Sequence, residues 1–162
     1  MAGEPDGSEE VVRGMFGPDV TFLGVPRAEL DALAGLDIVF LGAPYDAGTS
    51  HRPGARFGPQ ALRMTDYLPH DASRPHLALG VDPLVELRCA DIGDVMMPPV
   101  DTMQSLQRLE SVVQAVADAG AIPVILGGDH TVTLPDATGV ADRKSTRLNS
   151  SHITRSRMPS SA

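Results

Sequence analysis

The segment from Ile122 to His130 constrains the fold of this chain more than any other. Its first five residues, Ile122 to Leu126, are mostly apolar and predict a buried parallel strand, and two glycines permit a sharp turn directly after it. Asp129 and His130 then follow the turn. Because ligands bind at the carboxyl edge of the sheet in open α/β folds, the segment predicts functional polar groups at that edge.

Asp129 and His130 allow two interpretations. A neutral imidazole at His130 can ligate Zn, Mn, Fe or Ni, and Asp129 can either join it as a hard oxygen ligand or orient it. The alternative is a loop histidine satisfied by neighbouring polar groups, and a single Asp-His pair by itself favours that alternative.

Two further segments predict strands with polar residues behind them. Asp37 to Gly42 is mostly apolar and ends in glycine before a loop that carries Asp46 and His51. Leu84 to Ile92 predicts another short strand, which also leads into carboxylates. The order of strands and helices along the chain predicts an α/β domain with a parallel sheet and crossover helices.

The clearest helix is predicted from about Asp101 to Ala119. Asp101 is placed to cap it, Gln104 occupies the capping-box position, and Gly120 is the expected stop. A second, shorter helix is expected to begin at Pro59. Residues at helical spacing form a stripe that predicts packing against the sheet: Met103, Leu106, Leu109, Val113 and Val116.

Composition limits the possible functions. The chain has 162 residues, 42% of them hydrophobic, and no stretch long enough to cross a bilayer. A net charge of -8 argues against unaided binding to nucleic acid. The acidic start lacks the pattern of a secretory signal, and the single cysteine, Cys89, is expected in the core, so we expect a cytoplasmic protein.

Two motifs together resemble the ureohydrolase family, which includes the agmatinases and arginases. The first is Leu41-Gly-Ala-Pro-Tyr-Asp-Ala-Gly48 with the string Arg52 to Pro59, and the second is Leu126 to Pro135, which contains Gly-Gly-Asp-His. The similarity runs from about Thr21 to Ala141 in the family's order. The string RPGARFGP looks nearest to the agmatinase branch.

The resemblance implies an arginase-like three-layer α/β fold, of which the chain holds the amino-terminal part. It also implies hydrolysis of a linear guanidino compound, with agmatine giving putrescine and urea, by hydroxide bound to two manganese ions. Family members of full length usually form homo-oligomers. Guanidinobutyrase, guanidinopropionase and formimidoylglutamase are alternatives within the family, and a non-catalytic subunit is an alternative outside catalysis.

The family pattern assigns one metal ligand in this chain, His130. The other family ligands belong to a later Asp-Ala-His-x-Asp motif and a Ser-x-Asp-x-Asp motif, and neither motif occurs in this sequence. No catalytic or cofactor-binding residue is assigned. We therefore expect this chain to bind manganese weakly at best and to be inactive.

Three parts are expected along the chain. Residues 1–20 predict a mobile amino-terminal arm, residues 21–141 a truncated arginase-like ureohydrolase domain, and residues 142–162 a non-native disordered tail. The lysine and the asparagine of the chain, Lys144 and Asn149, both lie in that tail. Its residues 142–152 are identical to the translation of a sequencing-library adapter, although a basic interaction arm is the alternative.

The remaining polar residues favour structural roles. Asp46 and His51 are expected to brace a loop rather than shape a substrate entrance, and a phosphate cradle is disfavoured because its glycine motifs are absent. We expect ion pairs with carboxylates for Arg52, Arg56 and Arg63. We expect surface loops for His70 and His76, and turns or caps for Asp91 and Asp94.

Overall fold

The computed structural model describes residues 11–12, 20–65, 76 and 78–150. Its sheet has four strands in the order β1-β3-β2-β4. The strands are β1 (Val11–Val12), β2 (Ile38–Gly42), β3 (Cys89–Val95) and β4 (Ile122–Leu126). The α-helices are α1 (Gly58–Arg63), α2 (Pro83–Glu86), α3 (Thr102–Asp118) and α4 (Thr133–Ser150), and the 3₁₀ helices are η2 (Phe22–Gly24), η3 (Ala55–Phe57) and η4 (His130–Val132).

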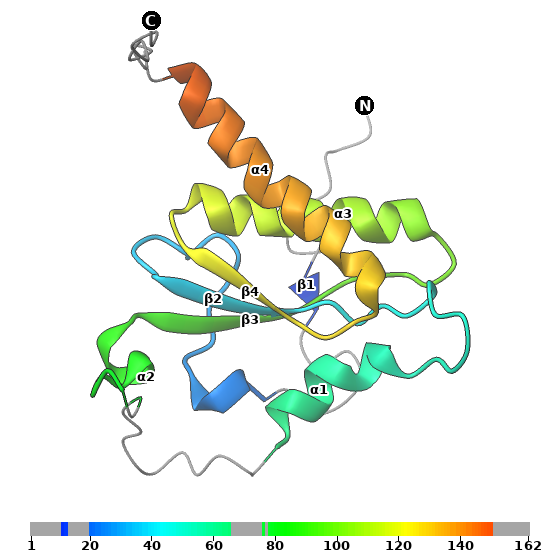
Figure 1. The fold of residues 1–162 in the computed structure, drawn as a ribbon, viewed down its shortest axis with the longest axis horizontal. Coiled ribbons are helices and arrows are strands. Elements are labelled where there is room, and N and C mark those ends of the chain that lie inside the picture. Colours follow the sequence, from blue (N-terminus) through cyan, green and yellow to red (C-terminus); the bar gives the residue numbers. More distant parts are fainter. Residues whose placement is uncertain (1–10, 13–19, 66–75, 77, 151–162) are drawn as a thin grey trace, which may run out of the picture.

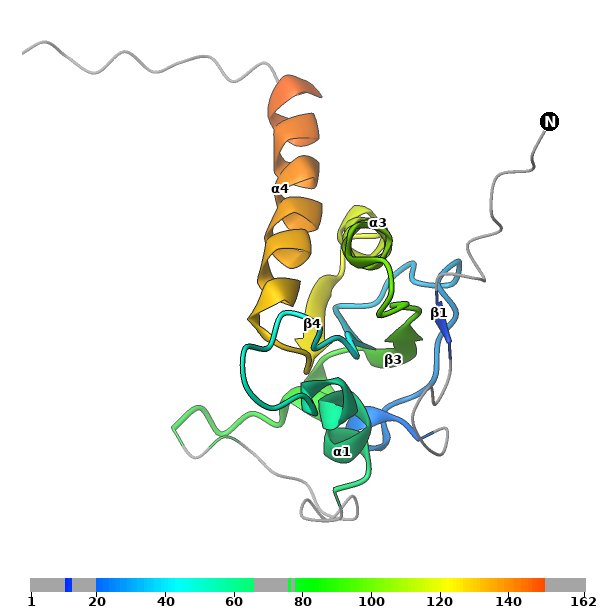
Figure 2. The same ribbon diagram turned by 90° about the vertical axis from the view of Figure 1, so that its right-hand side faces the viewer.

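The elements form three layers. Helices α3 and α4 cover one face of the sheet, and α1 lies on the other face (Figures 1 and 2). Strands β2, β3 and β4 are parallel, whereas β1 pairs antiparallel with β3. The predicted α/β class with a parallel sheet is therefore confirmed for these three strands.

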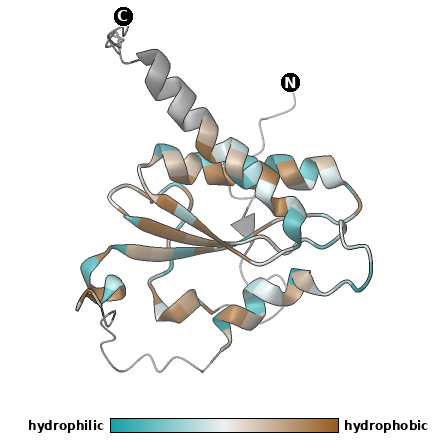
Figure 3. Ribbon diagram, viewed as in Figure 1, coloured by the Kyte–Doolittle hydropathy of each residue, from teal (hydrophilic) through white to brown (hydrophobic). Residues whose placement is uncertain are grey.

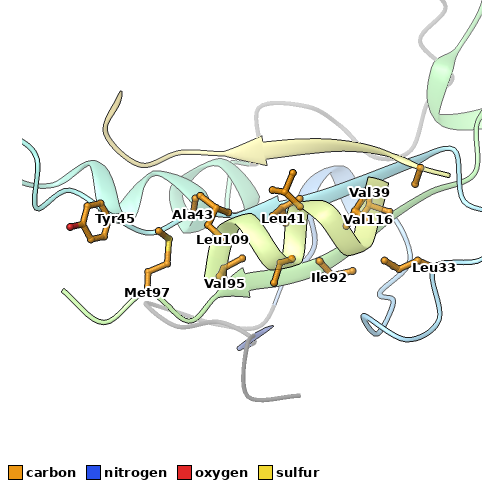
Figure 4. Packing of buried hydrophobic residues seen from close by; sticks show 13 residues of the cluster. Leu33, Val39, Leu41, Ala43, Tyr45, Ile92, Val95, Met97, Leu109 and Val116 are labelled. Carbon is orange, nitrogen blue, oxygen red and sulfur yellow. The ribbon is translucent and has the colours of Figure 1, made fainter. Parts of the chain in front are cut away.

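The main core lies between the sheet and α3. Alternation along β2 sends Val39 and Leu41 toward this core, where they pack with Ile92, Leu109 and Val116 (Figure 4). The apolar sequences of the central strands are visible as brown ribbons in Figure 3. A smaller apolar cluster on the other face contains Val25, Phe40, Cys89 and Leu126, so the predicted core position of Cys89 is confirmed.

Both ends of helix α3 lie where its sequence predicts them. The Asp101 carboxylate accepts a hydrogen bond from the Gln104 N–H at 2.9 Å, and Gly120 adopts φ +96° after the last turn. The predicted apolar stripe is wrong at Met103, whose side chain is 64% exposed. Met103 lies roughly 120° around the helix from Leu109, while Ser105 and Val112 share the buried face.

Two strand predictions need correction. Residues 84–86 belong to α2, because Asp82 accepts a hydrogen bond from the Leu84 N–H and Pro83 occupies the first turn, so β3 begins only at Cys89. Strand β4 was predicted to be buried, yet Ile122 is 63% exposed. In the described part of the chain β4 pairs with β2 and forms an edge of the sheet.

At each end of the described chain, the structure has an element that was not predicted from the sequence. Val11 and Val12, inside the arm predicted for residues 1–20, pair with Asp94 and Val95 of β3. Helix α4 was not predicted, and its backbone continues beyond Ala141 to Ser150, into the segment predicted as a disordered tail. None of the helices in the described residues is long and apolar enough to cross a membrane.

Candidate functional site

Two loops meet at the carboxyl edge of the sheet. The first loop (residues 43–49) follows β2 and the second loop (residues 127–132) follows β4, and Gly42 pairs with Leu126 where the strands end. The Ala43 N–H donates to the Leu126 carbonyl at 3.0 Å, and the Asp129 N–H donates to the Tyr45 carbonyl at 2.8 Å. The two sequence motifs are thus brought side by side, as the parallel pairing of their strands requires.

The Asp129 carboxylate binds backbone groups from both loops. Its Oδ1 accepts the Thr131 N–H at 2.8 Å, which caps η4, and its Oδ2 accepts the Gly48 N–H at 2.8 Å. Asp129 was predicted to be either a metal ligand or an orienting residue. Its two carboxylate oxygens accept backbone N–H groups of Thr131 and Gly48, so in this structure Asp129 orients the two loops.

His130 is exposed and is the first residue of η4. Its Nδ1 lies 3.5 Å from the Thr133 Oγ1. The histidine predicted as the metal ligand therefore stands at the carboxyl edge of the sheet with its ring open to solvent. In the described residues, no group of three His, Cys, Asp or Glu side chains is placed to hold a metal ion. A lone imidazole does not suffice for a two-metal site, so no metal-dependent step is derived from this chain.

A buried carboxylate of the first loop, Asp46, holds this loop to the segment that leads into α1. Asp46 is 2% exposed and accepts hydrogen bonds from the Gly54 N–H at 2.6 Å and the Arg56 Nε at 2.6 Å. The hydrogen bond from Arg56 holds the pKa of Asp46 below its usual value. The bracing role predicted for Asp46 and the ion pair predicted for Arg56 are confirmed, while His51 and Arg52 are exposed.

A buried ion cluster lies beneath the same edge. Arg63 of α1 donates to both carboxylate oxygens of Asp91, at 2.8 and 3.0 Å, and to the Gly93 carbonyl at 3.0 Å, and it also pairs with Asp94. Asp91 is further bound by the Phe22 and Gly93 N–H groups, each at 2.8 Å. The ion pair predicted for Arg63 is confirmed, but the turn or cap roles predicted for Asp91 and Asp94 are wrong.

A β-bulge places both carboxylates on the α1 face. Phe40 pairs with Asp91 and Gly42 pairs with Asp94, so two steps along β2 match three steps along β3. Strict alternation would send these two aspartates to opposite faces. Gly93, at φ +98°, supplies the extra residue.

The Asp94 carboxylate is only partly satisfied. Its Oδ1 pairs with Arg63, whereas its Oδ2 has no hydrogen-bond partner among the described residues and is buried. Burial raises the pKa of Asp94 above its usual value, against the lowering effect of Arg63. Relative to the unfolded chain, the folded state therefore shifts this carboxyl group toward its protonated form.

We expect Asp94→Asn to change how stability depends on pH. A raised folded-state pKa stabilises the fold below the ordinary pKa, and that contribution is lost as the pH rises through the folded-state value. The asparagine variant lacks this loss, so its stability relative to the natural chain should rise as the pH increases above about 4. Urea unfolding across this range measures the effect, and parallel profiles for the two proteins would contradict it.

Helix α1 connects the ion cluster to the turn of residues 127–130, called the histidine turn below. A Cβ placed on Gly127, which has φ +71°, would lie 2.5 Å from the Pro59 Cδ. Arg63 anchors the other end of this six-residue helix to β3. The turn before Asp129 is thus fixed from below by α1.

Several contacts at this edge were not predicted from the sequence. Tyr45 is buried and donates its hydroxyl hydrogen bond to the Thr102 Oγ1 at 2.7 Å, at the start of α3. Gly48 and Thr131 supply the backbone groups that Asp129 binds. No local pattern links residues so distant in sequence.

Of the predicted surface histidines, His76 is exposed as expected and His70 lies outside the described residues.

A family model described as the arginase family matches residues 36–151, which include β2, β3, β4 and both loops. The chain belongs to the arginase family. Its sequence is 39% identical to the mitochondrial agmatinase of Gallus gallus over 109 residues, which cover 67% of this chain and 31% of that protein. It is also 39% identical to the guanidinobutyrase of Pseudomonas aeruginosa over 137 residues, which cover 82% of this chain and 40% of that protein.

Solved structures show the same fold. The proclavaminate amidino hydrolase of Streptomyces clavuligerus superposes with a TM-score of 0.67 at 32% identity, covering 79% of this chain and 41% of that one. Trypanosoma cruzi formiminoglutamase, solved with Mn²⁺, gives a TM-score of 0.53 at 29% identity over 72% of this chain and 40% of that one. The chain therefore spans less than half the length of these relatives, and it has the arginase fold over that part.

Proposed function

We propose that the full-length protein represented by this chain is a manganese-dependent ureohydrolase that hydrolyses a linear guanidino compound. The observation that carries the proposal is the position of His130, which follows β4 in the Gly-Gly-Asp-His motif at the carboxyl edge of the sheet. Membership of the arginase family supports the reaction class. The Mn²⁺ in the Trypanosoma cruzi relative supports the choice of metal.

Agmatine is the proposed substrate, with putrescine and urea as products. The string from Arg52 to Pro59 and the similarity to the Gallus gallus agmatinase support this choice. A guanidinobutyrase is the second candidate, because the Pseudomonas aeruginosa enzyme of that name matches a larger share of this chain. We propose a cytoplasmic location, supported by the buried free thiol of Cys89.

We further propose that His130 is the one metal ligand that this chain contributes and that the chain alone is inactive. We also propose that residues 142–162 are a non-native tail, of which residues 142–152 match a translated sequencing-library adapter. The family match reaches residue 151 and the helix reaches Ser150, so the native gene beyond codon 141 is the direct test of that boundary.

The 162-residue chain is expected to release no urea from agmatine or 4-guanidinobutyrate with added Mn²⁺. The intact protein, expressed from a genomic clone that continues past codon 141, is expected to release urea from agmatine in preference to 4-guanidinobutyrate. Colorimetric detection of urea distinguishes the cases. Turnover by the short chain would overturn the inactivity proposal, and an intact gene without the two later ligand motifs would overturn the function.

A further inference from the structure

The Asp129 side chain joins the two loops at the carboxyl edge, in addition to the backbone hydrogen bonds between them. The Gly48 N–H and the Asp129 Oδ2 belong to residues 81 positions apart, yet they lie 2.8 Å from each other. The second oxygen of the same carboxylate caps η4 through the Thr131 N–H. One carboxylate therefore performs two separable tasks: it caps the turn that carries His130, and it ties that turn to the first loop.

Close packing of the backbones leaves little freedom in this contact. A Cβ on Gly48 would overlap the Thr131 Oγ1 and lie 3.0 Å from the Asp129 Oδ2. A Cβ on Gly128 would lie 2.5 Å from the Ala43 carbonyl oxygen. The glycines let the two loops approach until backbone and carboxylate touch, so the tie has a defined geometry.

We propose that Asp129 is a positioning residue that locks the first loop onto the histidine turn, so that both form one rigid rim. His51 and Arg52 follow Gly48 by three and four residues and are exposed, so the chain keeps their Cα atoms within roughly 14 Å of Gly48. The tie thus limits how far this exposed segment can move from the turn that carries His130. Its meaning for catalysis rests on the proposed function, whereas the tie itself does not.

The test separates the two tasks of Asp129. In Asp129→Ser the hydroxyl can still accept the Thr131 N–H at the cap, but the shorter side chain cannot also reach Gly48. We expect amide hydrogen exchange of Gly48, followed by NMR on the full chain, to accelerate by about tenfold or more. Exchange of the Thr131 amide is expected to stay close to its original rate.

Asp101→Ser is the matched control, because Asp101 caps α3 through the Gln104 N–H at a site outside the two loops. It should leave Gly48 exchange unchanged. Asp129→Asn, which keeps the side-chain size, serves as a second variant and should release one of the two N–H groups, that of Gly48 or that of Thr131, since its amide offers one oxygen instead of two.

Unchanged Gly48 exchange in both Asp129 variants would overturn the proposal. Equal acceleration at Gly48 and Thr131 would also overturn it, because that result means a general loosening of the turn. Failure of the ureohydrolase proposal is recognised separately, by an intact gene without further ligand motifs, and it would leave the exchange result standing.

Discussion

Arg63→Met is expected to destabilise the fold of this chain strongly. The side chain of Arg63 is 2% exposed and binds two carboxylates that are themselves fully buried. Methionine fills a similar volume but removes the cation that pairs with Asp94 and the nearer of the two that pair with Asp91, whose other partner is Arg27 at 3.7 Å. Removing one partner of a buried ion pair costs about 3–5 kcal/mol, a large part of the roughly 5–15 kcal/mol that stabilises an ordinary domain.

Arg88→Met is the matched control for this substitution. Arg88 also makes a two-point contact with an aspartate, since its Nε and Nη2 lie 3.0 and 2.9 Å from the Asp37 carboxylate. The pair is exposed, however, and solvent screens exposed pairs, so the loss of stability should be small. Urea unfolding followed by circular dichroism compares the variants. Similar midpoints for the two would show that the buried cluster does not hold α1 to the sheet.

The ion cluster around Arg63 was only partly predictable from the sequence. An ion pair was predicted for Arg63 because a guanidinium group makes bidentate contacts with carboxylates. The partners could not be identified, since strict alternation along β3 separates Asp91 from Asp94. The bulge at Gly93 that reunites them depends on the register between β2 and β3, which is a long-range property.

The predicted elements that succeeded have strong local signals. Strand β2 is a short apolar run that ends in glycine, and α3 has both a capping aspartate and a terminating glycine. The missed elements have weak or misleading ones. Strand β1 contains two residues and depends on pairing with β3, and α4 contains Pro135 and Gly139, which usually disfavour a helix.

Gly139 in α4 shows what replaces the missing local signal. A Cβ at this position would lie 2.8 Å from the Glu110 carbonyl oxygen of α3, so the glycine permits a close approach of the two helices. Pro135 lies in the first turn of α4, where its missing N–H costs little. Tertiary packing therefore stabilises a helix that its own sequence favours only weakly.

The candidate site was predictable in position but not in its internal contacts. The glycine pair after β4 predicted a turn at the carboxyl edge, and the structure places Asp129 and His130 there. The contact of Asp129 with Gly48 was not predictable, because it arises only when β2 and β4 lie next to each other. Motif order thus indicated which segments carry the chemistry, while the sheet determined which residues meet.

Gly127→Ala is expected to destabilise the fold more than Gly120→Ala, a change at a turn of the same backbone type. Gly127 has φ +71°, which costs an L-residue about 1–2 kcal/mol. The new methyl group would also lie 2.5 Å from the Pro59 Cδ and 2.9 Å from the Pro59 Cγ. Such overpacking against a rigid ring adds about 1–3 kcal/mol, because neither the proline nor its helix can move while Arg63 anchors α1.

Gly120→Ala isolates the first of these contributions, the backbone cost. Gly120 has φ +96° and ends α3, but a Cβ there would meet no other atom within 4 Å. It should therefore lose only the backbone contribution, about 1–2 kcal/mol. Urea midpoints that are lower for Gly127→Ala than for Gly120→Ala would confirm that α1 presses on the histidine turn. Equal midpoints would mean that α1 yields to the methyl group, and the ion cluster would then have no mechanical connection to His130.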